Sequence, residues 1–264
     1  MKTFFSQRIQ SRSLIALLAC ALLSSAQAEP ITVRYVQGDF HGFLEMRSED
    51  GHVVASGDST QIVHGGRITA ETIFHFKDGS LDDETAVYTQ SRTFQLVSYH
   101  HVQKGPFFPH PMDMSIDVRS GQVTIRTTGK DGKDEVDSEH MTLPADLANG
   151  IVPQMIESIG AERPGMTVSM LVATPKARLV KLDISPAGED NASVAGSVHK
   201  AKHYEVKIDL GGVVGVVAPL IGKAPPNIQL WIIGGTVPTF ARDKGPLYAE
   251  GPIMTIQLAS PVWP

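Results

Sequence analysis

Hydrophobic and polar residues alternate with a period of two along most of this chain from residue 31 onward, as in strands with one buried and one solvated face. Turn dipeptides such as Ser120-Gly121 and Asp131-Gly132 separate these stretches and place glycine where a tight turn needs a positive φ. The pattern predicts antiparallel hairpins, with seven or eight strands in an uninterrupted meander between Ile31 and Met141. The first expected strand is Ile31 to Tyr35, and later ones are Met166 to Ala173, Arg178 to Ile184, Ala201 to Leu210, Ile228 to Ile233 and Ile253 to Leu258.

A helical pattern interrupts the strands once. Leu147, Ile151, Met155 and Ile159 recur every four residues, which gives an apolar stripe along one face of a helix. Because proline is tolerated in the first turn of a helix but not in its middle, Pro153 restricts the helix to about Ile151 to Ile159. We expect the stripe to be buried against the concave face of the sheet.

The first 28 residues have the features of an export signal. A positively charged start precedes a short apolar stretch from Leu14 to Leu23, and Ala26-Gln27-Ala28 is a cleavage site for signal peptidase. This stretch is about half as long as a transmembrane helix, so we expect a cleaved leader, no transmembrane segment in the mature chain, and a periplasmic or secreted protein. Leu17-Leu18-Ala19-Cys20 approximates a bacterial lipobox, so a lipoprotein anchored at Cys20 is the alternative.

Residues 29–264 are expected to form one mainly β domain, because no linker, repeat or low-complexity tract divides them. The predicted fold is a curved antiparallel sheet or half-barrel wrapped around one short helix. The one cysteine lies in the leader, so the mature chain has no disulfide, thiolate metal site or cysteine nucleophile. It carries 20 basic and 28 acidic residues, and this net charge of −8 argues against nucleic acid and anionic membranes as partners.

Four runs of residues resemble an uncharacterised family of secreted β proteins from soil bacteria. The resemblance implies export and a single domain, and it supplies no catalytic residues. The expected architecture also resembles the half-barrel of the periplasmic lipoprotein carrier LolA, although no sequence motif carries that likeness. The four runs are Phe76 to Glu84 (FKDGSLDDE), Gln103 to Pro106 (QKGP), Leu143 to Gly150 (LPADLANG) and Ala259 to Pro264 (ASPVWP).

Ten histidines in the chain raise the question of a metal site. His100 and His101 are neighbours on an expected strand and point to opposite faces, so only one of them could join His110. His199 and His203 would be about 13 Å apart on a strand, which is too far to share one ion. We therefore expect neither a metal ion nor another cofactor.

The sequence contains no serine-hydrolase elbow and no zinc-protease motif, and we assign no catalytic residue. The acidic run Asp82-Asp83-Glu84 puts its first and third carboxylates on one face of a strand, a spacing that suits glycoside chemistry. We expect this run to form a solvated hairpin instead. A hydrolase or isomerase would use His101 or His110 as general base, oriented by Asp113 or Asp117.

Three apolar features bear on ligand binding. Residues 211–223 are glycine-rich and nearly uncharged, and form either a buried connection or a mobile flap over a cavity. Phe107-Phe108 lies between Gly-Pro and Pro-His-Pro, so its rings either plug the open end of the sheet or project into a pocket mouth. Trp231 begins a run that is apolar on both faces, and we expect it to be central and buried.

Together these features favour a non-enzymatic binding protein that encloses a lipid or another hydrophobic small molecule. One alternative is the extracellular hydrolase or isomerase. The other is an envelope assembly protein whose strand edges pair with an envelope protein partner. The residues expected to line the ligand site are Tyr99, His101, Phe107, Phe108, His110 and Trp231.

Overall fold

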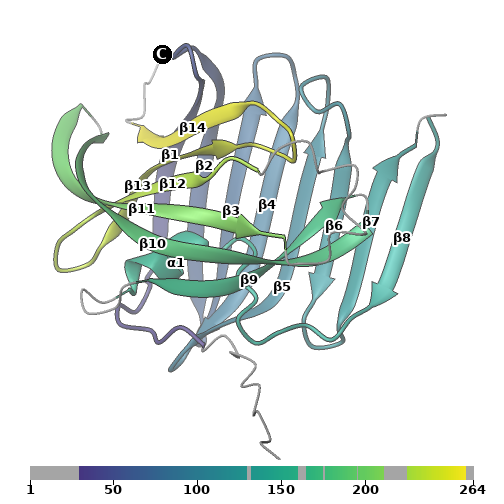
Figure 1. The fold of residues 1–264 in the computed structure, drawn as a ribbon, viewed down its shortest axis with the longest axis horizontal. Coiled ribbons are helices and arrows are strands. Elements are labelled where there is room, and N and C mark those ends of the chain that lie inside the picture. The colour runs from purple at the N-terminus through teal and green to yellow at the C-terminus, as the bar shows by residue number, and fades with distance from the viewer. Residues whose placement is uncertain are drawn as a thin grey trace, which may run out of the picture.

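The computed structural model of the protein describes residues 30–129, 132–159, 165–174, 176–194, 196–210 and 225–259 (Figure 1). Its strands form one antiparallel sheet of 14 strands that does not close, which confirms the expected curved sheet with one short helix. In the first eight strands, each pairs with the next in the predicted meander. They are β1 (Phe40–Ser48), β2 (Val53–His64), β3 (Arg67–Phe76), β4 (Leu81–Gln90), β5 (Phe94–Lys104), β6 (Met112–Asp117), β7 (Gln122–Thr128) and β8 (Asp134–His140).

A second meander follows the helix α1 (Val152–Glu157) and returns to the first. Its last strand, β14, pairs with β1, so the two meanders join into a single sheet. The strands of the second meander are β9 (Met166–Thr174), β10 (Lys176–Val194), β11 (Ser197–Asp209), β12 (Ile228–Ile233), β13 (Thr239–Pro246) and β14 (Ile253–Ala259).

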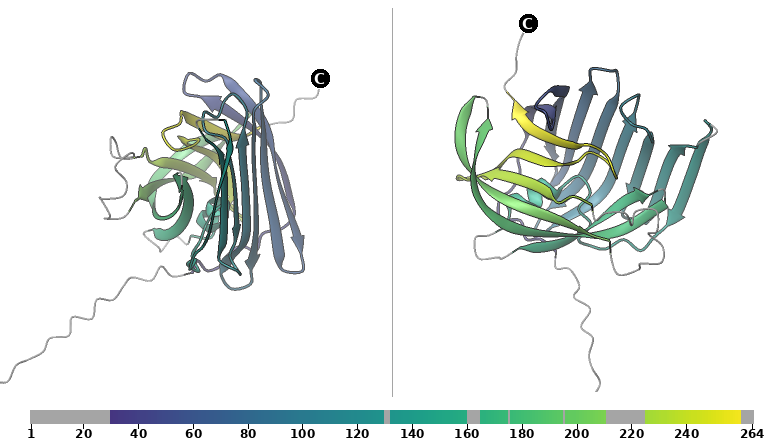
Figure 2. Two further views of the ribbon diagram at one scale, coloured as in Figure 1. Left: turned by 90° about the vertical axis from the view of Figure 1, so that its right-hand side faces the viewer. Right: turned by 45° about the horizontal axis from the view of Figure 1, so that its top comes forward.

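The sheet bends back on itself, so that the second meander crosses the inner face of the first (Figures 1 and 2). We call β1 to β8 the first wall and β9 to β14 the second wall. The main apolar core lies between the walls, with Tyr88 and Ile116 from the first and Leu182 and Val206 from the second. Met155 of α1 is fully buried in the same core, so the helix fills the space between the walls.

The apolar stripe at residues 147, 151, 155 and 159 is buried as expected, but the helix covers only part of it. Leu147 precedes the helix and forms a bridge to Ser169 in β9. Pro153 lies in the first turn of α1, where its missing N–H costs nothing, and the helix ends at Glu157.

Residues 146–149 cover the free edge of β9, the last strand of the sheet order. The side-chain amide of Asn149 imitates a paired strand: its Nδ2 donates to the Leu171 carbonyl at 2.8 Å, and its Oδ1 accepts from the Leu171 N–H at 2.9 Å. Asp146 is also buried and accepts from Ser169 Oγ at 2.9 Å and from Lys181 Nζ at 3.2 Å. These contacts satisfy backbone groups that would otherwise invite another chain.

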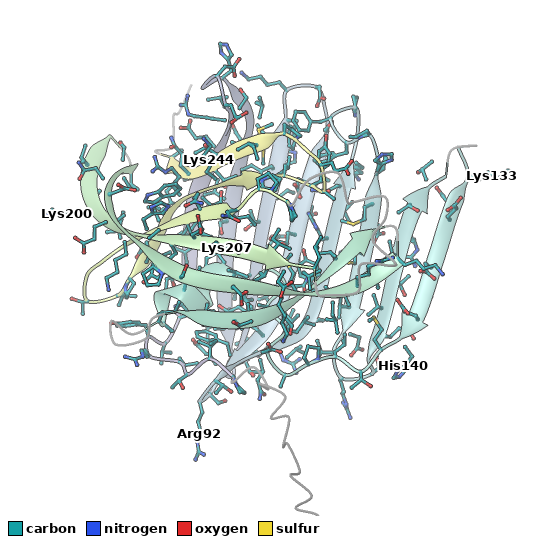
Figure 3. All side chains as sticks on the ribbon, viewed as in Figure 1. Arg92, Lys133, His140, Lys200, Lys207 and Lys244 are labelled. Atoms are coloured by element: carbon teal, nitrogen blue, oxygen red, sulfur yellow. The ribbon has the colours of Figure 1, made fainter. Side chains whose placement is uncertain are left out.

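The opposite end of the sheet is protected by charge. The strand β8 pairs with β7 alone, and Figure 3 shows it standing at the margin of the first wall between Lys133 and His140. Six of its seven residues are exposed, and four of the seven are acidic. Like charges on an edge strand disfavour pairing with a second copy of the same edge.

Two parts of the strand prediction differ from the structure. The segment expected as a first strand at residues 31–35 forms only a bridge between Thr32 and Thr93, because the next residues are held by side chains. Gln90 fixes the backbone of Gln37 there, accepting from its N–H at 2.6 Å and donating to its carbonyl at 2.7 Å. The strand β13 was not predicted, since Lys244, glycine and proline break its alternation.

Several expectations concern residues outside the described part of the chain. These are the leader with Cys20, the glycine-rich residues 211–223 and the last five residues, 260–264. Among the described residues, no helix has the length and apolar character needed to cross a membrane.

The segment 146–149 along the edge of β9 gives a first prediction. Replacing Asn149 by Ala leaves the buried N–H and carbonyl of Leu171 without partners, so N149A should lower the free energy of unfolding by roughly 2 to 3 kcal/mol. Urea denaturation measures this loss. Q95A, at an exposed amide on β5, is the control and should change stability little. Equal effects of the two substitutions would contradict the role assigned to Asn149.

Candidate functional site

A row of polar side chains crosses the inner face of β4 and β5. Asp82 and Glu84 point inward from β4, and they lie opposite Gln103 and His101 of β5 in the strand register. Tyr99 continues the row toward the main core. On the other side of the row lies a second apolar cluster that contains Phe74, Phe76 and Phe108. The polar row therefore separates two apolar parts of one interior.

Asp82 is the centre of this row. Its Oδ1 lies 2.7 Å from His101 Nε2, and its Oδ2 accepts from Gln103 Nε2 at 3.0 Å. Only 7% of Asp82 is exposed, so the expectation of a solvated hairpin at residues 82–84 was wrong. The physical reason is that β4 already begins at Leu81, and its inward face is covered there by the loop at Leu247.

Glu84 and Tyr99 form the second pair of the row. The Tyr99 hydroxyl donates to Glu84 Oε1 at 2.6 Å. Burial of the ring raises the pKa of Tyr99 well above its usual value, and the charges of Glu84 and Asp82 add to this, so the hydroxyl stays a donor. Gly150, at φ +70°, lets its loop pass close to the ring, where a Cβ would lie 3.1 Å from Tyr99.

A third carboxyl group comes from the opposite wall. Burial raises the pKa of Asp243, on β13, to about 7; a hydrogen bond from the Ile256 backbone opposes this, and the charge of Glu84 reinforces it. The two walls thus bring Glu84 and Asp243 into electrostatic contact. Asp243 gave no signal in the sequence, because β13 has no clear alternation.

The surroundings of His101 raise the pKa of its ring. Burial alone would lower the pKa of the ring, but the hydrogen bond to Asp82 and the charges of Asp82 and Glu84 outweigh that effect and raise it. As expected, the neighbouring His100 points to the other face, where its Nε2 lies 3.0 Å from Asp113 Oδ1. Asp113 therefore does not orient His101, and Asp82 takes that position instead.

Asp117, the other expected orienter, lies in a different place. It is at the end of β6, where its side chain accepts from the Ser120 N–H at 3.1 Å and stabilises a turn. Its contact is therefore local to the β6–β7 turn, away from the His101–Asp82 pair.

Four of the six expected site residues lie at the same end of β5. Tyr99 and His101 belong to the polar row, with ring centroids 6.0 Å apart. Phe107 and Phe108 follow β5 in a loop that is tied to the turn before β4, since Ser80 Oγ accepts from the Phe107 N–H at 2.8 Å. Phe108 is buried against Phe76 and Tyr248, at centroid distances of 5.4 and 5.9 Å. The aromatic rings thus border the polar row and pack into the end of the interior.

The remaining two expected residues do not join this group. His110 is exposed in the loop after β5. Trp231 is buried, as predicted, but on the outer side of the second wall, because its neighbours Leu230 and Ile232 point into the main core. There it stacks on His203 at 4.5 Å, and Arg242 lies 3.9 Å above its ring.

A pocket of about 20 Å³, room for about one water molecule, lies beside the end of α1. In the described residues no three or more His, Cys, Asp or Glu side chains are grouped so that they could hold a metal ion. The residues that line the pocket are Ile31, Thr32, Arg34, Ser158, Ile159 and Met166.

Another buried carboxyl group anchors the strand that carries Asp243. Glu157, at the end of α1, accepts from the Phe240 N–H of β13 at 2.9 Å and from Gln37 Nε2 at 3.1 Å. It is 8% exposed, and burial raises its pKa to about 7 against the effect of these two hydrogen bonds. Glu157 thus connects the helix, the second wall and the start of the described chain.

The raised pKa values predict that stability falls as the pH rises. Glu157 and Asp243 both bind a proton more tightly when folded, so their contribution is complete below the unfolded pKa near 4 and is lost as the pH passes about 7. His101, also raised, acts in the same direction. For Glu157 alone the loss is on the order of 3 kcal/mol.

Urea titrations at pH 5, 6, 7 and 8 measure this slope. E157Q removes one titrating group and should flatten the decline, whereas E71Q, at an exposed site on β3, should keep it. A wild-type stability that is constant or rises over this range would contradict the assignment.

Comparisons with known proteins reach only the level of a distant fold likeness. No protein-family model matches the chain, and no curated protein matches it. Among solved structures it is similar to the crystal structure of the hypothetical lipoprotein YmcC from Escherichia coli K12, at 9% identity and a TM-score of 0.34. The match covers 85% of this chain and 86% of that one. A likeness this distant assigns neither a family nor a function, and the resemblance to LolA stays a prediction.

Proposed function

We propose that the protein is an exported binding protein for a hydrophobic small molecule with a polar head group. The head group would bind at the Asp82–His101 row, and the apolar part would lie against the rings of Phe107 and Phe108. The observation that carries the proposal is the partly buried group of Asp82, Glu84 and Asp243 beside an aromatic cluster. Export rests on the leader sequence.

Burial of several carboxyl groups is expensive, and an apolar interior would fold more stably without them. Clusters of titratable groups with shifted pKa values are typical of functional sites. The row is also within reach of solvent, since 17% of the His101 side chain is exposed and both Glu84 and Asp243 are half-buried. These points support a binding role over a purely structural one.

The chemistry of the row favours a head group that donates hydrogen bonds. Carboxylates only accept when ionised. Asp82 and Glu84 lie beside His101, and Asp243 of the opposite wall lies near Glu84. A protonated amine would donate hydrogen bonds to these carboxylate oxygens and so replace the water molecules that the oxygens lose on burial. A carboxylate head group would meet like charge, as it would across the whole mature chain with its net charge of −8.

A series of ligands with one chain length tests this proposal. Isothermal titration should give the order dodecylammonium, then dodecanol, then dodecanoate, and butylammonium should bind far more weakly because it lacks the apolar part. E84Q should weaken dodecylammonium binding about tenfold, the cost of one charge-assisted hydrogen bond of about 1.5 kcal/mol.

The control for E84Q is D113N, which removes an acidic group from the outer face of the same wall. It should leave the affinity unchanged. Equal affinity for the three head groups would refute the role of the polar row, and absence of binding by all four compounds would refute the proposed function.

A second candidate is a hydrolase or isomerase that uses His101 as an acid–base group. It is favoured by one specific observation, the 2.7 Å contact that orients the ring through Asp82. This candidate predicts turnover on a panel of ester and glycoside substrates that falls at least 100-fold in H101N and persists in H110N. A wild-type protein without turnover on the panel would refute this candidate.

A further inference from the structure

The end of the β10–β11 hairpin extends beyond the rest of the sheet. Pairing of β10 with β9 stops at Ile184, and pairing of β11 with β12 starts at Ala201. Residues 191–194 and 197–200 therefore form a two-stranded ribbon, which curls away from the walls in Figures 1 and 2. Figure 3 places Lys200 at the outer part of this ribbon.

The two faces of the ribbon differ. Asp190 and Ala192 face the second wall, where Asp190 Oδ2 accepts from Trp231 Nε1 at 3.0 Å and Ala192 is buried. Because side chains alternate along a strand, Asn191 and Ser193 lie together on the opposite face. Both are exposed, and Asn191 lies opposite Lys200 in the register.

The sequence of this face is that of an acceptor for asparagine glycosylation. Asn191-Ala192-Ser193 fits the pattern in which any residue except proline separates asparagine from serine or threonine. The chain contains three asparagines, and the other two, Asn149 and Asn227, lack a hydroxyl residue two positions later. The one acceptor sequence thus coincides with the most exposed ribbon of the second wall.

We propose that Asn191 carries a glycan, added from a lipid-diphosphate-linked oligosaccharide by a transferase outside the cytoplasm. A bond forms between Asn191 Nδ2 and the anomeric carbon of the first sugar. The bond from that carbon to the phosphate oxygen breaks, the lipid diphosphate leaves, and the amide proton passes to a base of the transferase. The inference rests on export, which is part of the proposed function.

The position of Asn191 gives the glycan a physical purpose. The β9 edge is covered by residues 146–149, and the β8 edge is charged. Residues 191–194 of β10, in contrast, carry no charged side chain and pair with β11 alone within the described chain. Opposite Ser193, Val198 is 70% exposed. A bulky solvated sugar would keep this edge from pairing with another chain.

The ribbon also suits the transferase. Its ladder connects only two strands, and such segments open locally far more easily than the centre of a sheet. The acceptor can therefore be presented to an enzyme after folding as well as before it.

Peptide mass spectrometry of the protein from the cells that make it tests the proposal. Trypsin should release residues 182–200, a peptide in which Asn191 is the one asparagine. We expect this peptide to be heavier by at least one sugar, and enzymatic release of the glycan should convert Asn191 to aspartate. N191Q and S193A should both lose the added mass, while S193T should keep it, because threonine also completes the acceptor.

Each result is decisive. An exported wild-type protein with an unmodified peptide would overturn this inference and leave the binding proposal standing. Added mass that survives in N191Q would lie on another side chain and would overturn it too. A protein that keeps its leader inside the cell would overturn both the glycan and the proposed export. Thermal unfolding of N191Q should match the wild type, because the Asn191 side chain is exposed.

Discussion

The pairing of β1 with β14 is the contact on which the rest of this structure depends. Six residue pairs, from Phe43 with Ala259 to Ser48 with Met254, join the two meanders into one sheet. The partners are more than 200 residues apart, so the chain must close a long loop before this ladder forms. The entropy lost is offset by the apolar core that both walls then share.

That same ladder assembles the candidate site. Asp82, Glu84 and His101 belong to the first wall, while Asp243 belongs to β13, the neighbour of β14. Neither wall alone would bring Glu84 close enough to raise the pKa of Asp243. The site is made from both walls and therefore exists only in the completed fold. There its polar groups lie between two apolar clusters, whose burial stabilises the fold that holds them.

The alternation of hydrophobic and polar residues predicted most of the strands. It did not predict which face of each strand is buried and which is exposed to solvent. It correctly placed Asp82 and Glu84 on one face of a strand, and Ala86 and Tyr88, two and four residues further on, share that face. Ala86 and Tyr88 are largely apolar, which indicates that this face of β4 points inward. The three acidic residues at 82–84 indicate the opposite, and for this reason the sequence predicted a solvated hairpin there. Asp243 could not be found in this way, because its position is set by pairing with distant strands and not by a local pattern.

Ionisation and the proposed ligand binding would be linked at β13. Glu157 holds the Phe240 N–H at one end of this strand, and Asp243 lies three residues further on; both have a pKa of about 7. A cationic head group that contacts Asp243 favours its ionised form and must lower that pKa, so binding releases a proton. The free energy that the ligand supplies then replaces part of the stability lost by ionisation. The strand that is weakened by neutral pH in the free protein is therefore the one that a bound cation would restore.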